Sequence, residues 1–246
     1  MSNNASNNVS NYLWPDGPIF EEASGVFKLG TDSVLLSHFV KTSNVKRRGL
    51  AADLGCGSGI ISIILSWQFP ELQFKGIEIS EPAAALAVRN VKLNGLEERV
   101  HIILGDLRNH DLLSAGAYDL VVSNPPYFAD GSGKLHCDTN IAAARAEQSC
   151  SLEDICKAAG HMTRWGGSFM LVHKPERLAD IFKHMQNAGF EPKRMRFVQH
   201  KAASPPNIVL VEARRGGKPS LNVEAPLILT CEDGSDSDEV KMIYRR

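Results

Sequence analysis

The sequence predicts an α/β fold built on a seven-stranded, mainly parallel sheet, with an antiparallel hairpin at its C-terminal end and helices on both faces. Short apolar runs alternate with longer helical stretches, which is typical of parallel strands joined by crossover helices. The runs are apolar on both faces, as strands between two helix layers must be. A glycine-rich turn follows the first run, where open sheets of this Rossmann-like kind bind ligands.

The first run, residues 50–54, leads into the turn Gly55-Cys56-Gly57-Ser58-Gly59, and residues 60–69 follow as a helix. Glycines let a ligand approach the backbone closely, and Asp53 at the strand end is placed to pair with an ammonium group. The spacing Gly-x-Gly-x-Gly is weak by itself, because nucleotide sites and ordinary tight turns also contain it. Gly55, Gly57 and Gly59 are therefore candidate cofactor contacts that need support from other motifs.

Two further strands each end in an acid. Residues 74–78 end at Glu78, roughly twenty residues past the glycines, the usual place for a carboxylate that holds ribose hydroxyls. Residues 100–106 end at Asp106, which could accept a hydrogen bond from an adenine amine. The neighbouring residues Ile79 and Leu107 are assigned to the same cofactor site.

The strand 119–123 closes on the tetrapeptide Asn124-Pro125-Pro126-Tyr127, the most informative feature of the chain. The prolines fix φ and carry no N–H, so the loop holds its carbonyls outward as acceptors without rejoining a sheet ladder. Asn124 adds a side-chain acceptor, and Tyr127 adds a flat aromatic face. These groups suit a planar amide or an aromatic amine. The tetrapeptide is a candidate amine-methylation site, provided that the chain also binds a methyl donor.

Upstream of the glycine turn, residues 33–40 are predicted to form a helix whose first turn is capped by Thr31 or Asp32. Phe27, Gly30 and Thr31 are expected beside the cofactor, with the helix start near its carboxylate end. A plain helix cap next to a core phenylalanine explains the same residues equally well.

Beyond the tetrapeptide, Phe128 and Arg145 are candidate substrate contacts. Arg145 could stack on a base or bind a phosphate, and its alternative is a solvated salt bridge with Glu147 or Glu153. The loop 129–141 between them is long enough to move over a substrate.

The remaining elements complete the sheet. Helices are predicted from residue 82 to a cap at 94–95, at 151–163 and at 175–187, with a strand at 167–173. The strands 194–199 and 208–213 are separated by too few residues for a crossover helix, so they are expected to form the antiparallel hairpin.

Composition fits one domain at residues 15–246 behind a disordered, Asn- and Ser-rich tail at residues 1–14. No apolar run reaches the length of a membrane span, and the N-terminus lacks a signal-peptide core. The five cysteines include no Cys-x-x-Cys pair, so neither a disulfide framework nor a zinc or other metal site is indicated. We expect a cytoplasmic protein.

The net charge of −1 averages two opposed segments. Residues 191–218 hold seven basic residues and two acids, whereas residues 232–239 hold five acids and no base. The first segment could form a basic face for nucleic acid, or simply a solvated hairpin edge protected by lysine and arginine. The sequence favours neither interpretation.

In their order along the chain, these signals resemble the class I S-adenosylmethionine-dependent methyltransferases. Residues 53–59 match the first motif of that class, Glu78 the second, Asp106 the third and residues 124–127 the fourth. An NAD site is the nearest rival, but the third glycine of its usual pattern is absent, since position 60 is Ile. The resemblance implies S-adenosylmethionine as the cofactor.

More narrowly, the chain resembles the bacterial tRNA1(Val) (adenine(37)-N6)-methyltransferase family over roughly residues 14 to 246. The segments that carry this resemblance are 27–36, the glycine turn, 124–128, 144–147 and 207–212. The resemblance implies a tRNA partner and an adenine beside the anticodon as the methyl acceptor. The expected mechanism lays a flipped-out adenine on Tyr127, with its amine donating to the Asn124 side-chain oxygen and the Pro125 carbonyl.

Three alternatives stay open at this stage. A protein glutamine N5-methyltransferase would grip its planar amide with a similar tetrapeptide. A guanine N2-methyltransferase of RNA would present another aromatic amine. A non-catalytic methyltransferase-like module would bind RNA or a partner, and the intact Asp53, Glu78, Asp106 and Asn124 count against it.

Overall fold

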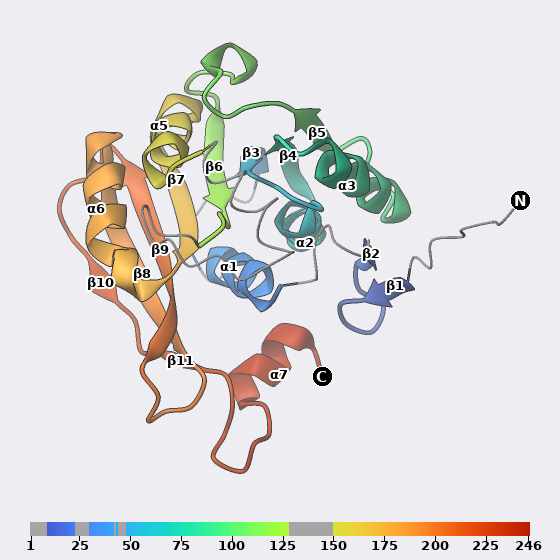
Figure 1. The fold of residues 1–246 in the computed structure, drawn as a ribbon, viewed down its shortest axis with the longest axis vertical. Coiled ribbons are helices and arrows are strands. Elements are labelled where there is room, and N and C mark those ends of the chain that lie inside the picture. Colours follow the sequence, from blue (N-terminus) through green and yellow to red (C-terminus); the bar gives the residue numbers. More distant parts are fainter. Residues whose placement is uncertain (1–8, 23–29, 42, 44–47, 128–149) are drawn as a thin grey trace, which may run out of the picture.

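The computed structural model describes residues 9–22, 30–41, 43, 48–127 and 150–246. Its main sheet has the strand order β10-β8-β9-β7-β6-β3-β4-β5 (Figure 1). The seven long strands are β3 (Arg48–Leu54), β4 (Glu71–Glu78), β5 (Val100–Leu104), β6 (Tyr118–Ser123), β7 (Thr163–His173), β8 (Phe190–Gln199) and β9 (Pro206–Arg215). Strands β3 to β7 pair in parallel, and β9 runs antiparallel to both β7 and β8.

The predicted fold class is therefore confirmed, including the closing hairpin. Two short strands extend the sheet beyond the predicted seven, because β10 (Asn222–Val223) and β11 (Leu227–Ile228) both pair in parallel with β8. The segment after the hairpin thus returns along the outer edge of β8.

Helices cover both faces of the sheet (Figure 1). In the described part of the chain they are α1 (Thr31–Lys41), α2 (Ile60–Gln68), α3 (Glu81–Leu93), α5 (Leu152–Met162), α6 (Leu178–Asn187) and α7 (Asp238–Tyr244). Side chains of β6 alternate between two cores: Leu120 and Val122 pack with α1 and α2, while Val121 packs with α5 and α6. Successive strand residues point to opposite faces, so this alternation is why the strands read as apolar throughout.

Several predicted boundaries shift. Helix α1 begins at Thr31, so Thr31 and Asp32 lie inside its first turn, and the prediction that they cap a helix starting at residue 33 is wrong. Strand β7 begins at Thr163 rather than at residue 167. The helix expected from Pro175 opens with a 3₁₀ turn and becomes α-helical at Leu178.

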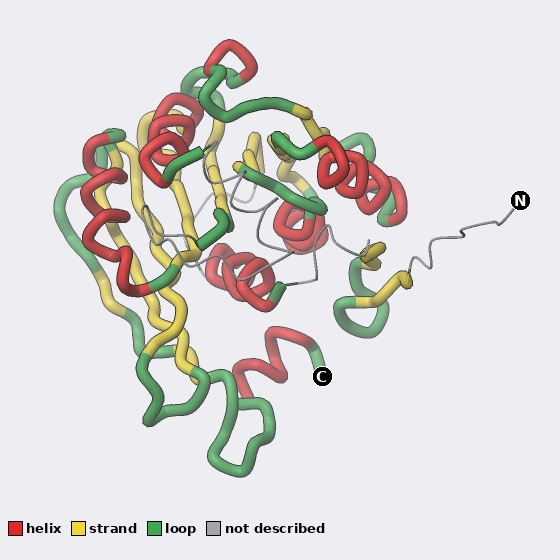
Figure 2. Tube along the Cα trace, viewed as in Figure 1, coloured by secondary structure: helices red, strands yellow, loops and turns green. Residues whose placement is uncertain are grey.

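The N-terminal region contains an antiparallel strand pair whose first strand lies within the expected tail (Figure 2). Strand β1 (Val9–Tyr12) pairs with β2 (Ile19–Glu22), and Trp14 in the connection is buried. The backbone N–H of Ile19 donates to the side-chain oxygen of Asn94, 2.9 Å away at the end of α3. Residues 9–14 of the expected tail thus belong to the described structure, whereas residues 1–8 lie outside it.

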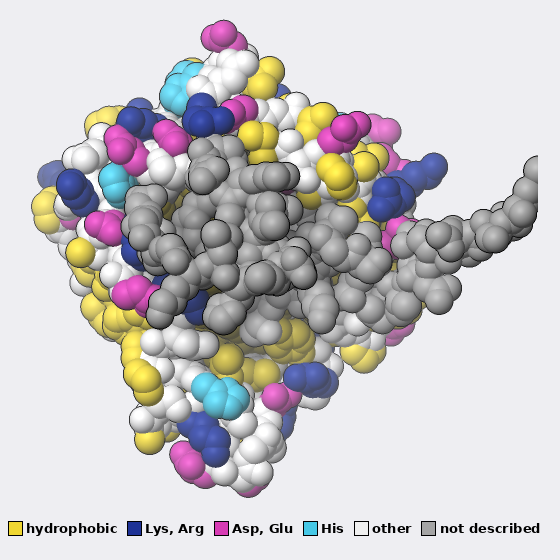
Figure 3. Space-filling model, viewed as in Figure 1, with side chains coloured by type: hydrophobic (Ala, Val, Ile, Leu, Met, Phe, Trp, Pro, Cys, Tyr) yellow, Lys and Arg dark blue, Asp and Glu magenta, His cyan; other side chains and the backbone are white. Residues whose placement is uncertain are grey.

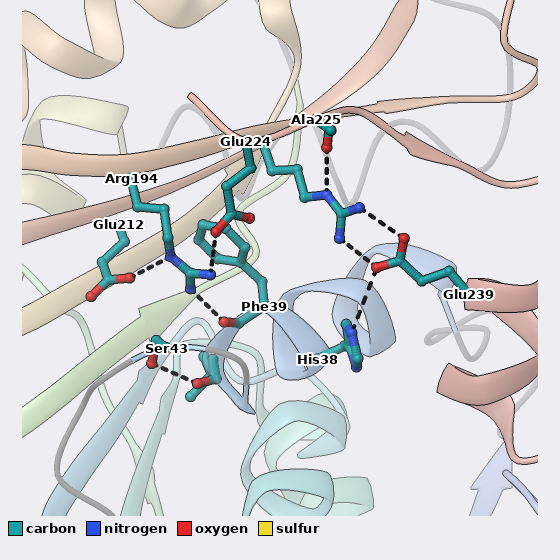
Figure 4. A network of polar contacts seen from close by, with 10 residues as sticks. His38, Phe39, Ser43, Arg194, Glu212, Glu224, Ala225 and Glu239 are labelled. Carbon is teal, nitrogen blue, oxygen red and sulfur yellow. Dashed lines mark hydrogen bonds and ion pairs between the residues drawn. The ribbon is translucent and has the colours of Figure 1, made fainter. Parts of the chain in front are cut away.

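The basic segment and the acidic run lie against each other. Arg194 donates to Glu212 (2.8 Å) and to Glu224 (3.1 Å), and Arg196 clasps Glu239 with two hydrogen bonds of 2.5 and 2.8 Å (Figure 4). On the face drawn in Figure 3, basic and acidic side chains are interspersed. Arg194 and Arg196 of the basic segment are thus paired with carboxylates inside the molecule.

The same network fixes the C-terminal end of α1. The Arg194 guanidinium donates to the Phe39 carbonyl oxygen at 2.6 Å and stacks on the Phe39 ring at 3.7 Å (Figure 4). Near the end of this helix, the Nε2 atom of His38 lies 3.9 Å from Glu239. Arg194 therefore anchors α1 to the hairpin, and Glu239 of α7 lies close to His38 of the same helix.

Within the described ranges, no helix is long and apolar enough to cross a membrane.

Candidate functional site

The glycine turn, the acids Glu78 and Asp106, and the tetrapeptide lie at the ends of four neighbouring parallel strands, β3, β4, β5 and β6. The register at these ends pairs Leu54 with both Ile77 and Ser123, and Glu78 with Leu104. Because the carboxyl ends of parallel strands meet at one edge of the sheet, the glycine turn, the two acids and the tetrapeptide are brought together there.

The glycine turn adopts a backbone that other residues rarely accept. Gly55, Gly57 and Gly59 have φ values of 68°, 55° and 81°, in the left-handed region. The N–H groups of Gly55 and Cys56 donate to the Ile77 carbonyl at 2.9 and 3.1 Å, which ties the turn to β4. A Cβ atom added to Gly55 or Gly57 would meet nothing within 4 Å. The turn therefore leaves free space above its first two glycines.

Glu78 links the end of β4 to this turn. Its carboxylate accepts a hydrogen bond from the Gly57 N–H at 2.9 Å and another from the Ser80 N–H at 2.8 Å. Each carboxylate oxygen has a second lone pair, so Glu78 can still accept hydrogen bonds from a ligand. The next residue, Ile79, is 43% exposed and offers an apolar surface beside it.

Asp53 lies beneath the turn and is fully buried. Its Oδ2 atom accepts hydrogen bonds from the Ser62 hydroxyl at 2.9 Å and from the Ser62 N–H at 3.2 Å. Its Oδ1 atom has no hydrogen-bond partner among the described residues. Burial raises the pKa of Asp53 to about 7, against the lowering effect of the Ser62 hydrogen bonds. In this geometry Asp53 pins the first turn of α2 to β3 and keeps one acceptor unused.

Asp106 is more exposed and already has a cationic partner. Two guanidinium nitrogens of Arg108 donate to its carboxylate at 2.5 to 3.0 Å, and the hydrogen bond from Arg108 lowers the pKa of Asp106. Leu107 between them is buried. The sequence analysis did not identify Arg108, although an arginine two residues after a site acid can indicate an ion pair such as Arg108–Asp106.

The tetrapeptide is held by the first turn of α1. Asn124 donates from Nδ2 to the Ser33 hydroxyl oxygen at 2.9 Å, and the Tyr127 hydroxyl lies 2.5 Å from Asp32 Oδ2 and 3.1 Å from Asn124 Oδ1. Burial and, next, the Asp32 carboxylate raise the pKa of Tyr127 far above its ordinary value. Sequence reasoning missed the roles of Asp32 and Ser33, because more than ninety residues separate them from their partners.

Within the tetrapeptide, Pro125 is buried and Pro126 is exposed. Thr31, predicted to contact a cofactor, is exposed at the start of α1. Three predicted site residues, Phe27, Phe128 and Arg145, lie outside the described residues.

Two residues at the end of β7 also contact the tetrapeptide. The ring centroids of His173 and Tyr127 are 5.3 Å apart, and Lys174 Nζ lies 5.2 Å from the Tyr127 ring centroid. His173 accepts the Lys174 N–H at Nδ1, and burial lowers the pKa of His173 to about 4, so its ring is neutral near pH 7. His173 ends the predicted strand 167–173, and Lys174 follows it. Because this strand is parallel to β6, the position of the two residues could have identified them.

Comparison with known proteins agrees with this geometry. The model of the methyltransferase small domain family matches residues 19–188, more than half of the chain. A tRNA1(Val) (adenine(37)-N6)-methyltransferase of Yersinia pseudotuberculosis serotype O:3 (strain YPIII) is 41% identical over 147 residues, which are 59% of this chain and 56% of that protein. The Yersinia pestis (strain Pestoides F) protein of the same name is also 41% identical over 147 residues, 57% of its length. The match spans little more than half the length of these curated relatives.

Solved structures share the fold. A predicted O-methyltransferase from Agrobacterium tumefaciens superposes with a TM-score of 0.70 at 19% identity, covering 87% of this chain and 96% of that one. A geranyl diphosphate C-methyltransferase from Streptomyces coelicolor A3(2) gives a TM-score of 0.55 at 12% identity, covering 74% and 78%. The family match, the sheet order and the motifs at the strand ends lead to one assignment: the chain belongs to the methyltransferase small domain family.

Proposed function

We propose that this chain is an S-adenosylmethionine-dependent methyltransferase that methylates the N6 amine of an adenine in tRNA, next to the anticodon. The observation that carries the proposal is the tetrapeptide 124–127, held by α1 at the same sheet edge as the glycine turn. The 41% identity to proteins named as tRNA1(Val) (adenine(37)-N6)-methyltransferases supports the substrate class.

The residues around the glycine turn fit the cofactor. Free space above Gly55 and Gly57 suits a ligand that lies against the backbone, and the remaining lone pairs of Glu78 suit ribose hydroxyls. The unused Oδ1 of Asp53 suits the ammonium group of the methionine moiety if the turn opens slightly. Ile79, Asp106 and Leu107 would line the adenine of the cofactor. When bound, the cofactor supplies an electrophilic methyl group on sulfur.

The tetrapeptide would hold the methyl acceptor. The Asn124 side-chain oxygen and the Pro125 carbonyl accept the two amine protons of the adenine, while the Tyr127 ring stacks on the base. An aromatic amine is a poor nucleophile because its lone pair is conjugated with the ring. Two acceptors favour the pyramidal, positively charged nitrogen of the transition state over the planar ground state. The buried neutral ring of His173 packs against Tyr127 at a tilt of 57° and helps to hold the tyrosine ring in place.

Residues outside the described ranges complete the proposal. Phe27 would contact the cofactor, and Phe128 and Arg145 would contact the flipped base and its phosphates. Residues 15–246 would form one domain, and a tRNA substrate implies that the protein works in the cytoplasm.

Methyl transfer from labelled S-adenosylmethionine tests the proposal against its rivals. Total tRNA and total protein from cells that lack this protein are offered in parallel, and labelled nucleosides are identified by mass spectrometry. Label in N6-methyladenosine supports the proposal. Label only in protein would replace it with glutamine-amide methylation, and label in N2-methylguanosine would replace the acceptor base. Binding of the cofactor without any label would indicate a non-catalytic module.

A further inference from the structure

The Tyr127 hydroxyl lies between two oxygen atoms that both act as acceptors. Asp32 Oδ2 is 2.5 Å away, and Asn124 Oδ1 is 3.1 Å away. A phenol carries one proton, so it can donate to only one of them at a time. The shorter contact is to a carboxylate, and hydrogen bonds to charged acceptors are both shorter and stronger than hydrogen bonds to amides. The proton therefore points to Asp32.

The orientation of the Asn124 amide is fixed from its other side. Its Nδ2 group donates to the Ser33 hydroxyl oxygen at 2.9 Å, which directs Oδ1 to the opposite side of the amide. With the Tyr127 proton held by Asp32, this oxygen receives no hydrogen bond from the phenol. Both of its lone pairs stay available for an amine.

We propose that Asp32 is a positioning residue for methyl transfer: it holds the Tyr127 proton and so keeps Asn124 Oδ1 open as an acceptor for the substrate amine. This inference rests on the proposed function, since it concerns the same amine. Without Asp32, the phenol proton turns to Asn124 Oδ1, the remaining acceptor within reach, and competes with the substrate. The Tyr127 hydroxyl then occupies the Asn124 oxygen that would otherwise accept the substrate amine.

The position of Asp32 suits this task. It lies in the first turn of α1, where the helix dipole stabilises a carboxylate. The opposite end of this helix is anchored by the Arg194 network. Because burial and Asp32 itself raise the pKa of Tyr127, the phenol keeps its proton throughout the pH range of an enzyme assay.

A purely structural role for Asp32 predicts a different pattern of rates. If Asp32 merely supports the fold, removing the Tyr127 hydroxyl as well cannot help, and the double variant is at best as active as Asp32→Ala. If Asp32 controls the proton, Tyr127→Phe removes the competing donor while keeping the stacking ring. The double variant then recovers activity that the single variant has lost.

The experiment measures kcat and KM for labelled methyl transfer to unmodified tRNA with the wild type, Asp32→Ala, Tyr127→Phe and the double variant. We expect Asp32→Ala to lower kcat about tenfold, equivalent to one competing hydrogen bond, and the double variant to be several-fold faster than Asp32→Ala. Asp238→Ala is the matched control, because Asp238 is also a first-turn acid but its side chain is fully exposed on α7. Melting temperatures and calorimetric titration with S-adenosylmethionine verify that each variant folds and binds the cofactor.

The outcomes separate the two proposals. A wild type that leaves tRNA unlabelled overturns the proposed function and this inference with it. A labelling wild type with Asp32→Ala at wild-type kcat overturns the inference alone. A double variant that is no faster than Asp32→Ala also overturns the inference alone, even if both variants have lost cofactor binding.

Discussion

Arg194 offers a quantitative test of how the C-terminal hairpin supports the site. Its side chain is 12% exposed and binds Glu212, Glu224 and the Phe39 carbonyl at the end of α1. The change to methionine keeps the apolar stem that packs on the Phe39 ring but removes the charge and its hydrogen bonds. The carboxylate of Glu212, itself 14% exposed, would then be left without this partner.

Removing one partner of a buried ion pair costs about 3 to 5 kcal/mol, and the slight exposure of both side chains places Arg194→Met near 3 kcal/mol. For a chain of this size that loss corresponds to roughly 9 °C in melting temperature. Arg194→Lys keeps the charge but not the planar fork, so its loss should be intermediate. Urea titration monitored by circular dichroism measures the free energy of unfolding.

Lys157→Met provides the control. Lys157 pairs with Glu153 on the surface of α5, where the two side chains are 57% and 51% exposed, and a pair so screened by solvent contributes little to stability. If Arg194→Met destabilises the protein no more than Lys157→Met does, the network does not anchor α1 and the reasoning is refuted.

Three further predictions concern the site. Asn124→Ala should lower kcat about a hundredfold with little change in the dissociation constant of S-adenosylmethionine, measured by initial rates and calorimetry; equal losses in both would contradict its role as amine acceptor. Gly57→Ala should cost about 1 to 2 kcal/mol and weaken cofactor binding, whereas Gly95→Ala, at a similar positive φ after α3, should cost as much and leave binding intact. The pKa of Asp53, about 7 when folded and ordinarily 3.8, means that the native state retains a proton that the unfolded chain loses. Unfolding free energy should therefore fall by up to about 4 kcal/mol as pH rises from 4 to 7, and Asp53→Asn should abolish that slope; parallel pH curves for the two proteins would refute the burial argument.

The fold could be predicted because its signals are local. The alternation of Leu120, Val121 and Val122 between two cores is written in consecutive residues, and the short connection after β8 permits only a hairpin. The acids at the strand ends could be located because strand ends are themselves predictable. Each of these inferences needs only a short window of sequence.

The contacts that hold the tetrapeptide join residues that are far apart in the sequence. Asp32 lies 95 positions from Tyr127, and Ser33 lies 91 positions from Asn124. The sequence around residue 32 indicated only a helix start, because a first-turn acid has the same local appearance whether it faces solvent or a tyrosine. Only the packing of α1 against the sheet decides between the two, and that packing depends on the whole fold.

Charge counting left two interpretations of residues 191–218 open, a basic face and a solvated hairpin edge, for a related reason. Arg194 and Arg196 of this segment are directed to carboxylates that lie 18 to 43 positions away in sequence. Arginines committed in this way cannot also neutralise phosphates without breaking internal pairs. Lys174 contrasts with them: its Nζ atom donates to the backbone carbonyl of Asn207 at 3.3 Å and lies over the Tyr127 ring. Among the described residues no carboxylate forms an ion pair with Lys174, which lies beside the ring on which the base would stack. Lys174 is therefore better placed to meet a phosphate flanking that base than Arg194 or Arg196.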